Sequence, residues 1–237
     1  FFIKKDFWLF FSQLLSYILI NITMESIEFK NRKVFIHKND ISQDINYGEI
    51  VGIDTETTGL SILRDRICLI QICTENKECH IVKFDQINKN DNTALNIKRF
   101  LNDDKIEKIF HYARFDLSMI RNSFGIKCKN IFCTKIASKL VRTYTDRHGY
   151  KEICKELLDV DINKTQQSSD WASNNLTDNQ FKYAISDVIY LHELRNKLII
   201  MLKRENRLDL ARNIYDFLES RVELDVSGWD KEDIFAH

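Results

Sequence analysis

Four acidic residues, placed in three separate segments, are the side chains of this chain best suited to chemistry. Asp54 and Glu56 lie in the stretch IDTETTGL, and Asp116 ends the stretch HYARFD. Asp187 lies in YAISDVIYL, four residues after Tyr183. Carboxylates that gather in one site repel one another and take up protons unless cations neutralise them. Two divalent metal ions would balance four carboxylates, and such a pair, about 4 Å apart, is the usual means of hydrolysing a phosphodiester.

The first segment is typical of a buried strand that ends at an active-site edge. Residues 49–56, EIVGIDTE, are largely apolar and rich in β-branched residues, and Thr58-Gly59 signals a turn after them. Residues two positions apart on a strand point to the same side, so Asp54 and Glu56 are expected to share a face. The alternative is an exposed strand end with two solvated acids.

The second segment predicts a strand followed by a helix. IEKIFHYA, from Ile106 into Ala113, is a strand candidate, and RFDLSMIRNSF has apolar residues at helical spacing before Gly125. Asp116 therefore lies in the first turn of the predicted helix, where the helix dipole favours an acid. Helix capping is thus the alternative to a metal-binding role for this residue.

The third segment lies within a helix that is predicted to run from Thr177, as its cap, to about Arg204. Tyr183 and Asp187 are four residues apart and share one helix face. A tyrosine at this spacing is also common in a protein core, and an acid beside an apolar stripe is also common at its boundary. The pair gains its meaning from the other two segments.

Taken together, the three segments resemble the DEDD superfamily of 3′–5′ exonucleases, and most closely the ribonuclease D family, in the subclass with tyrosine in the third motif. The stretch RTYTDRHGYKEICKELLDVDINKTQQSSDW, residues 142–171, is similar throughout to compact bacterial members. The resemblance runs from about Lys33 to about Leu202. It implies an α/β fold of the ribonuclease H-like type, in which a mixed β-sheet is flanked by α-helices.

The resemblance also implies a role for each acid. Asp54, Glu56 and Asp187 would hold the metal ion that carries the attacking water, and Asp54 would also bridge to a second ion. Asp116 would help to hold the second ion through water, and Tyr183 would orient the attacking water. The cofactors implied are two divalent ions, Mg²⁺ or Mn²⁺, which are hard cations that carboxylate oxygens suit. The tyrosine is assigned to positioning because a phenol with a pKa of about 10 is a poor base at neutral pH.

Four further residues are predicted to bind the substrate. Thr57 and Leu60 match positions that contact the terminal nucleotide in related exonucleases, and His111 and Arg114 stand close to Asp116 in the second motif. Arg114 also belongs to a group of basic residues that would form either a local phosphate-binding strip or an ordinary solvated surface. The group comprises Arg64, Arg66, Arg114, Arg142, Arg147, His148 and Lys151.

Length and composition predict a single domain, and the overall charge gives no sign for or against nucleic-acid binding. Of the 237 residues 44% are hydrophobic, which is enough for a sizeable core, and no Pro- or Gly-rich linker marks a boundary. Lys and Arg number 35, as do Asp and Glu, so the net charge is zero and does not by itself indicate nucleic-acid binding. Six cysteines without a C-x-x-C pair predict reduced, buried thiols and a cytoplasmic location.

The first 23 residues are foreign to the family pattern. Residues 7–22 are strongly apolar, but they are shorter and more interrupted than the roughly 20 apolar residues of a membrane span. We interpret residues 1–23 as translated from upstream of a natural start at Met24, which leaves residues 24–237 as the exonuclease domain. The alternative is a membrane anchor, and a stable membrane partner is expected only in that case. The 34 residues after Lys203 are too few for the helical nucleic-acid-binding domains of larger ribonuclease D proteins.

The remaining elements are predicted from apolar periodicity and turn signals. Strands are expected at residues 33–37, as an edge strand, and at 66–74, 79–84 and 130–134. Helices are expected at residues 93–103, 135–141, 150–158 and 208–218. Strands first, then strands alternating with helices, and finally helices predict a mixed sheet covered by helices.

The leading functional prediction is a metal-dependent 3′–5′ exoribonuclease that trims structured RNA such as tRNA precursors. A 3′–5′ exonuclease acting on DNA is the alternative, because metal ions contact phosphates and a preference for RNA depends on contacts to the 2′-hydroxyl. A nucleic-acid-binding module without catalysis is a third alternative, which would be expected to lack one of the acids. The expected partners are RNA or DNA 3′ ends, with no small-molecule cofactor.

Overall fold

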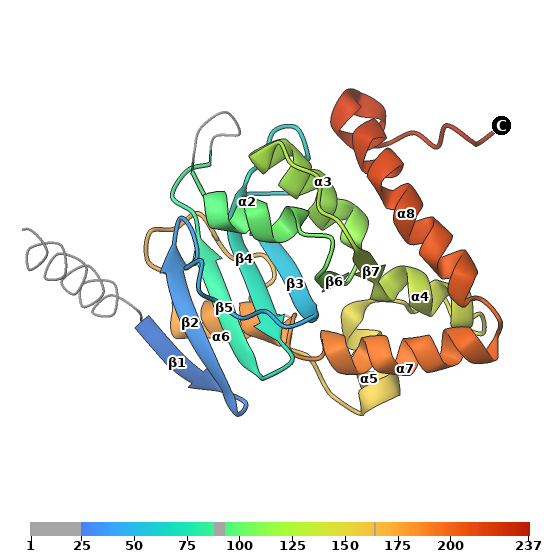
Figure 1. Cartoon of the computed structure of the whole chain (residues 1–237), viewed down its shortest axis with the longest axis horizontal. Helices are drawn as coiled ribbons and strands as arrows, with labels where there is room; N and C mark the ends of the chain where they lie inside the picture. Colours follow the sequence, from blue (N-terminus) through green and yellow to red (C-terminus); the bar gives the residue numbers. More distant parts are fainter. Residues whose placement is uncertain (1–24, 88–92, 164) are drawn as a thin grey trace, which may run out of the picture.

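A mixed sheet of seven strands lies at the centre of the molecule (Figure 1). The structure, a computed structural model, describes residues 25–87, 93–163 and 165–237. The strands are β1 (Glu25–Phe29), β2 (Arg32–Lys38), β3 (Ile50–Thr57), β4 (Ile67–Thr74), β5 (Glu78–Lys83), β6 (Glu107–Phe110) and β7 (Ile131–Cys133). Their order across the sheet is β1-β2-β5-β4-β3-β6-β7.

Strand direction brings three strand ends together. β3, β4 and β5 are antiparallel neighbours, whereas β6 runs parallel to β3, and β7 runs parallel to β6. Parallel strands end at the same edge of a sheet, so the carboxyl ends of β3, β6 and β7 lie side by side. The predicted strands are confirmed, although β6 stops at Phe110. The expected edge position of residues 33–37 is wrong, because β1 forms a hairpin with β2 and takes the edge itself.

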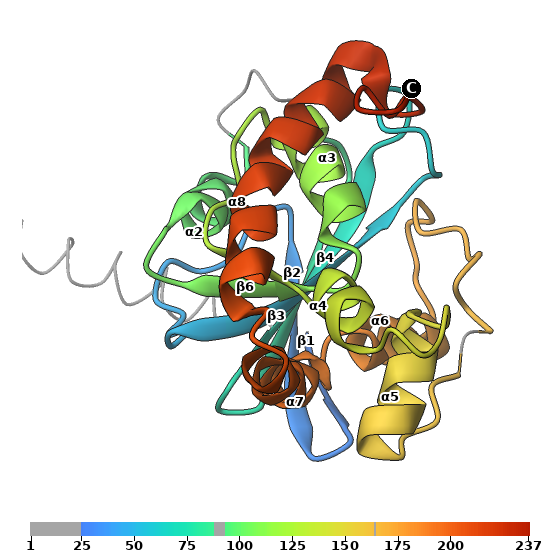
Figure 2. The same cartoon turned by 90° about the vertical axis from the view of Figure 1, so that its right-hand side faces the viewer.

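Helices cover both faces of the sheet (Figures 1 and 2). They are α2 (Leu95–Asn102), α3 (Ala113–Phe124), α4 (Thr134–Val141), α5 (Tyr150–Leu158), α6 (Asp178–Ser186), α7 (Leu191–Arg204) and α8 (Leu208–Leu224), followed by a π-helical turn η1 (Asp225–Trp229). Thr55 of β3 contacts α3, whereas Gly52, three residues earlier, faces the start of α7. Strand residues alternate between the two sides of a sheet, so α3 and α7 lie on opposite faces. β4 is buried along its whole length, as expected for a strand covered on both faces.

The helix expected over residues 177–204 is in fact two helices, α6 and α7. Between them, the N–H groups of Val188 and Leu191 donate to carbonyl groups three residues earlier, so the chain turns more tightly than in an α-helix. This turn packs closely against Gly52, since a Cβ atom there would lie 2.9 Å from the Val188 carbonyl oxygen. The break places Asp187 at the end of α6 instead of the middle of a long helix.

The ends of the other helices follow the sequence closely. Thr177 caps α6 in a reciprocal capping box with Gln180, and Gly125 ends α3 in the left-handed conformation. α8 continues past its expected end at Leu218 to Leu224. Within the described ranges, none of the helices is both long enough and apolar enough to span a bilayer. The interpretation of residues 1–23 concerns a segment outside the described residues.

Candidate active site

A cleft of about 580 Å³ opens at the edge where β3, β6 and β7 end. The end of β3 contributes Asp54 and Glu56, and the first turn of α3 contributes Asp116. Tyr183 and Asp187 reach the cleft from α6 and its C-terminal end. The four predicted acids and the predicted tyrosine, which are far apart in the sequence, therefore line one cleft.

Three of the acids are close enough to share one cation. Asp54, Glu56 and Asp187 each offer a carboxylate oxygen, and these oxygens all lie within 4.8 Å of one another. Asp54 and Glu56 are two residues apart on β3 and so share a face, as predicted. Oxygen donors of this kind suit hard divalent cations such as Mg²⁺ and Mn²⁺. The residues present thus fit the metal ions expected from the sequence.

Without a cation, Asp54, Glu56 and Asp116 keep their protons to a higher pH than ordinary carboxyl groups do. Burial, followed by the charges of Asp187 and Asp116, raises the pKa of Glu56 to about 9. Burial and the same neighbouring charges, with that of Glu56, raise the pKa of Asp54 well above its ordinary value. Burial also raises the pKa of Asp116 to about 7. A bound cation favours the charged carboxylates and would lower all of these pKa values.

Asp116 enters the cleft from the α3 side of the sheet. It lies in the first turn of α3, as predicted, and only 3% of its surface is exposed. The hydroxyl of Thr55 donates a hydrogen bond of 2.7 Å to its carboxylate, which favours the charged form. Asp116 does not belong to the three acids whose oxygens lie within 4.8 Å of one another, although its charge, after burial, contributes most to the raised pKa of Asp54. Its contact with a second ion therefore stays a prediction.

Tyr183 is held between an acid and an indole ring. Its hydroxyl is hydrogen-bonded to Asp187, and burial together with the charges of Asp187 and Glu56 raises the pKa of the phenol above its ordinary value. The centroid of its ring lies 5.9 Å from that of Trp171. A phenol in this setting keeps its proton at neutral pH, so it is suited to orienting a water molecule and not to removing a proton.

Three of the four predicted substrate-binding residues line the cleft. Thr57 and Leu60 follow the two acids of β3, and 84% of the surface of Leu60 is exposed. His111 follows β6, and its Nδ1 lies 2.9 Å from the hydroxyl oxygen of Thr134. The exposed side chain of Leu60 therefore gives the cleft an apolar surface beside the polar side chains of Thr57 and His111.

Two arginines of the predicted basic group, Arg114 and Arg142, form ion pairs away from the cleft. Arg114, predicted to bind substrate, does not line the cleft, because its guanidinium pairs with Asp225 on the side of α3 that faces η1. Arg142 is buried and pairs with Glu156. Neither guanidinium belongs to a solvated basic strip.

The cleft also contains residues that the sequence did not single out. The ammonium of Lys135 lies 4.0 Å from the centroid of the Tyr112 ring, and both residues line the cleft with Trp171. A signal for Lys135 existed, because it follows β7 within two residues and β7 ends at the same edge as β3. Tyr112 and Trp171 carried no comparable signal, since an aromatic residue is more often part of the core.

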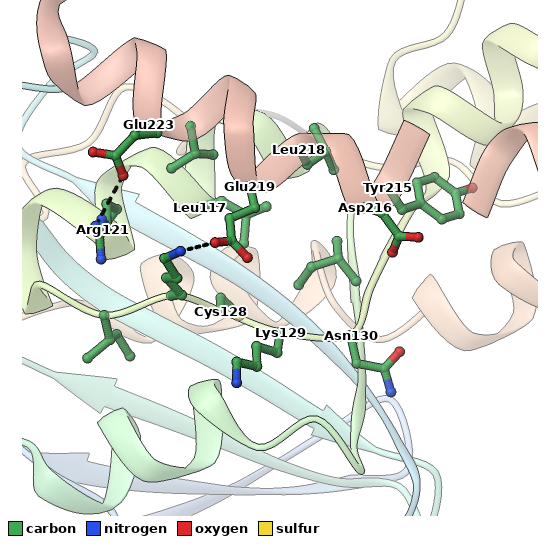
Figure 3. A pocket seen from close by; sticks show the side chains of 14 residues that line it. Leu117, Arg121, Cys128, Lys129, Asn130, Tyr215, Asp216, Leu218, Glu219 and Glu223 are labelled. Atoms are coloured by element: carbon green, nitrogen blue, oxygen red, sulfur yellow. Dashed lines mark hydrogen bonds and ion pairs between the residues drawn. The ribbon is translucent and has the colours of Figure 1, made fainter. Parts of the chain in front are cut away.

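A second, smaller pocket of about 230 Å³ lies between α3, the segment 126–131 and α8 (Figure 3). Ion pairs between Arg121 and Glu223 and between Lys127 and Glu219 cross it. Burial raises the pKa of the Cys128 thiol in its wall to about 12, so this thiol keeps its proton at neutral pH. The catalytic groups predicted from the sequence lie in the larger cleft.

The mixed sheet, its covering helices and the acids at the end of its central strand define a class, that of ribonuclease H-like proteins with clustered carboxylates. A sequence model described as 3′–5′ exonuclease matches residues 36–203 of this chain. The chain therefore belongs to the 3′–5′ exonuclease family, and its resemblance to ribonuclease D is confirmed.

Individual relatives support the same assignment. The ribonuclease D of Gluconacetobacter diazotrophicus is 31% identical over 160 residues, which are 67% of this chain and only 39% of that protein. This chain thus spans well under half the length of that relative. The structure of Brucella melitensis NrnC is 48% identical with a TM-score of 0.81, and the match covers 86% of this chain and 98% of that chain. Two further NrnC structures, 46% and 47% identical and both with a TM-score of 0.80, contain bound Mg²⁺ and pGG, respectively. Escherichia coli RNase D, 22% identical with a TM-score of 0.64 over 74% of this chain and 45% of that chain, shares the fold.

Proposed function

We propose that this chain is a metal-dependent 3′–5′ exoribonuclease, which removes nucleotides from RNA 3′ ends by hydrolysing phosphodiester bonds. One observation carries the proposal: Asp54, Glu56 and Asp187 have carboxylate oxygens within 4.8 Å of one another in a cleft that also contains Asp116 and Tyr183. Escherichia coli RNase D is an exoribonuclease involved in structured RNA processing, and we expect the same role for this chain.

The four acids of the cleft would act as two sets of metal ligands that share Asp54. Asp54, Glu56 and Asp187 would hold one divalent ion, and Asp54 with Asp116 would hold a second. When bound, two such ions lower the pKa of water and stabilise the charge that develops on the phosphate and on the leaving oxygen. The Mg²⁺ bound to Brucella melitensis NrnC supports magnesium as the natural choice.

Other residues of the chain orient the reactants. Tyr183 holds a water molecule through its hydroxyl, and the hydrogen bond to Asp187 fixes the direction of that hydroxyl. Leu60 and Thr57 contact the terminal nucleotide, and His111, which follows the end of β6, lines the same cleft. Among the described residues that line the cleft, Lys135 is the one lysine or arginine. Its ammonium group faces the phosphate. A cation there partly offsets the charge of the incoming RNA backbone.

A second candidate is an exonuclease that prefers very short RNA, down to dinucleotides. Brucella melitensis NrnC, 47% identical and covered over 98% of its chain, binds pGG. The cleft volume of about 580 Å³ lies within the range of pockets that enclose a small ligand, roughly 300–1,000 Å³. A zero net charge also agrees with a substrate that has few phosphates.

A single hydrolysis assay separates these alternatives. RNA of two, five and twenty nucleotides, each labelled at the 5′ end, and DNA of the same sequences are incubated with protein and Mg²⁺. We expect stepwise loss of 3′ nucleotides from RNA, and no hydrolysis in the presence of chelator or with Asp187→Asn. Asp178→Asn is the matched control, because Asp178 lies on the same helix but is exposed in its first turn.

Each outcome has a defined meaning. Equal hydrolysis of RNA and DNA would replace the exoribonuclease by a nuclease without sugar preference. Hydrolysis of the dinucleotide alone would favour the second candidate. Binding of RNA without hydrolysis by the wild-type protein, in Mg²⁺ and in Mn²⁺, would contradict the proposed function and favour a binding module.

We also propose a cytoplasmic location. All six cysteines lie in the described part of the chain and none of them forms a disulfide, including Cys73 and Cys79, which face each other on neighbouring strands. Thiols so placed are typical of a reducing compartment. Fractionation of cells that express the chain, with detection of the protein in the cytosolic fraction, tests this location.

A further inference from the structure

Arg114 ties the first turn of α3 to the C-terminal turn η1. Its Nε and Nη2 atoms donate hydrogen bonds to the two carboxylate oxygens of Asp225, and each donor lies 2.8 Å from its acceptor. Its Nη2 also donates a hydrogen bond of 2.7 Å to the carbonyl oxygen of Asp230. A guanidinium that binds both oxygens of one carboxylate is fixed in direction as well as in position.

Asp225 is completely buried and is surrounded by donors. Arg221, four residues earlier, donates two hydrogen bonds to its Oδ1. One comes from Nε at 3.0 Å and the other from Nη2 at 2.6 Å. The hydroxyl of Ser118, on α3, lies 3.2 Å from its Oδ2 and 2.7 Å from the carbonyl oxygen of Arg114. A buried carboxylate destabilises a protein unless it is paired and hydrogen-bonded. The donors around Asp225 meet that requirement and join α3 to the end of α8.

The first turn of α3 is not held by a cap of its own. Tyr112, which precedes the helix, has a φ of 69° in the left-handed region and makes no side-chain capping hydrogen bond. Thr55 of β3 binds the carboxylate of Asp116 on one side of the turn. Arg114 lies two residues before Asp116. In a helix of 3.6 residues per turn, their side chains are therefore separated by about 200° around the helix axis. Asp225 therefore holds the turn from the side opposite to Thr55.

We propose that Arg114 and Asp225 are positioning residues of the active site, which keep Asp116 directed into the cleft by fixing the first turn of α3. This inference rests on the proposed function, because it affects catalysis only if Asp116 takes part in metal binding. It gives a role to a segment outside the family match, since Asp225 lies beyond residues 36–203. Arg114 acts through Asp116 and does not touch the substrate.

Two substitutions in the full chain test the proposal. Asp225→Asn removes the charge but keeps the shape, and Arg114→Lys keeps the charge but loses the two-pronged contact. For each variant, Mn²⁺ affinity is measured by calorimetry on metal-free protein, and kcat and KM are measured on a short RNA. We expect Mn²⁺ affinity to fall about tenfold or more, with kcat falling in parallel and KM nearly unchanged. Arg114→Lys is expected to give a smaller effect in the same direction.

A neighbouring ion pair offers a matched control. Arg121 and Glu223 also join α3 to α8, through an ion pair of 3.1 Å between Nη2 and Oε2. Both side chains are partly exposed and line the second pocket (Figure 3). Glu223→Gln is expected to leave Mn²⁺ affinity and kcat unchanged. Asp225→Glu, which restores a carboxylate, is expected to recover part of the loss seen in Asp225→Asn.

The decisive comparison is made at a temperature at which circular dichroism shows the variants to be folded. If Asp225→Asn and Arg114→Lys lower the melting temperature but keep wild-type Mn²⁺ affinity and kcat, the positioning role is wrong and the contact only stabilises the fold. If Asp225→Asn does not fold, Arg114→Lys decides on the same criteria. Asp116→Asn separates the two proposals: wild-type Mn²⁺ affinity and activity in that variant would contradict the assigned site itself.

Discussion

Replacement of Glu56 by glutamine is expected to stabilise the metal-free protein at neutral pH. Burial and the neighbouring acids raise the pKa of Glu56 from 4.5 to about 9 in the folded state. A group whose pKa is raised by folding contributes stability that is fully present below its unfolded pKa, here about 4.5, and that is lost as the pH rises toward 9. Glutamine carries no charge at any pH and avoids this loss.

The size of the effect follows from the pKa shift. Each pH unit above 4.5 costs the wild-type protein about 1.4 kcal/mol until the folded pKa is reached, so the loss amounts to roughly 3 kcal/mol at pH 7. This is an upper limit, because Glu56 shares its protons with Asp54 and Asp116 in the same cleft. For a chain of this length it corresponds to a rise in melting temperature of about 6–12 °C at most.

The assay is thermal unfolding followed by circular dichroism, in chelator, from about pH 5 to about pH 8. Buried His37 and His80 have lowered pKa values and contribute in the opposite sense, because their stabilisation is lost as the pH falls below about 6.5. The quantity to follow is therefore the difference in melting temperature between Glu56→Gln and wild type, with the exposed Glu49→Gln as control.

We expect this difference to increase with pH in chelator. Saturating Mg²⁺ should reduce or reverse it, because the cation stabilises the ionised wild-type cleft and Glu56→Gln lacks a ligand. A difference that is flat between pH 5 and pH 8, or equal to that of Glu49→Gln, would refute the conclusion that the acids repel one another in a shared buried site.

Three further predictions test other parts of the cleft and its support. Tyr183→Phe is expected to lower kcat about tenfold or more with Mn²⁺ affinity unchanged; an unchanged kcat would remove the tyrosine from the mechanism. Leu60→Ala is expected to raise KM several-fold without altering the melting temperature, since the side chain is 84% exposed; an equal KM would exclude contact with the nucleotide. Gly52→Ala is expected to destabilise the fold by roughly 1–3 kcal/mol, as measured by denaturant unfolding, because the added Cβ would meet the Val188 carbonyl oxygen at 2.9 Å; wild-type stability would show that the break between α6 and α7 shifts freely.

Much of the fold could be predicted because local signals and tertiary packing agree. The apolar runs at β3, β4 and β5 are buried strands, and α5 spans Tyr150–Leu158 as expected. Thr177 and Gly125 mark helix ends through side-chain and backbone preferences that act locally. The three acidic segments could be assigned to one site because their spacing matches a known family pattern.

The rest depends on contacts between residues that are distant in the sequence. Apolar periodicity continues through Val188 and Ile189, so the break after α6 has no local signal, and it is the approach to Gly52 that accompanies it. Arg114 carries no sign in the sequence that its partner is Asp225, 111 residues away. Both residues could have been placed only with the packing of α3 against η1 in hand.

The measurement that tests the account most directly is the position of Mn²⁺ in crystals of the metal-soaked protein, from anomalous scattering. The account predicts a strong peak bound by carboxylate oxygens of Asp54, Glu56 and Asp187. Density without a peak at these three residues, at a Mn²⁺ concentration that supports hydrolysis in solution, would contradict it.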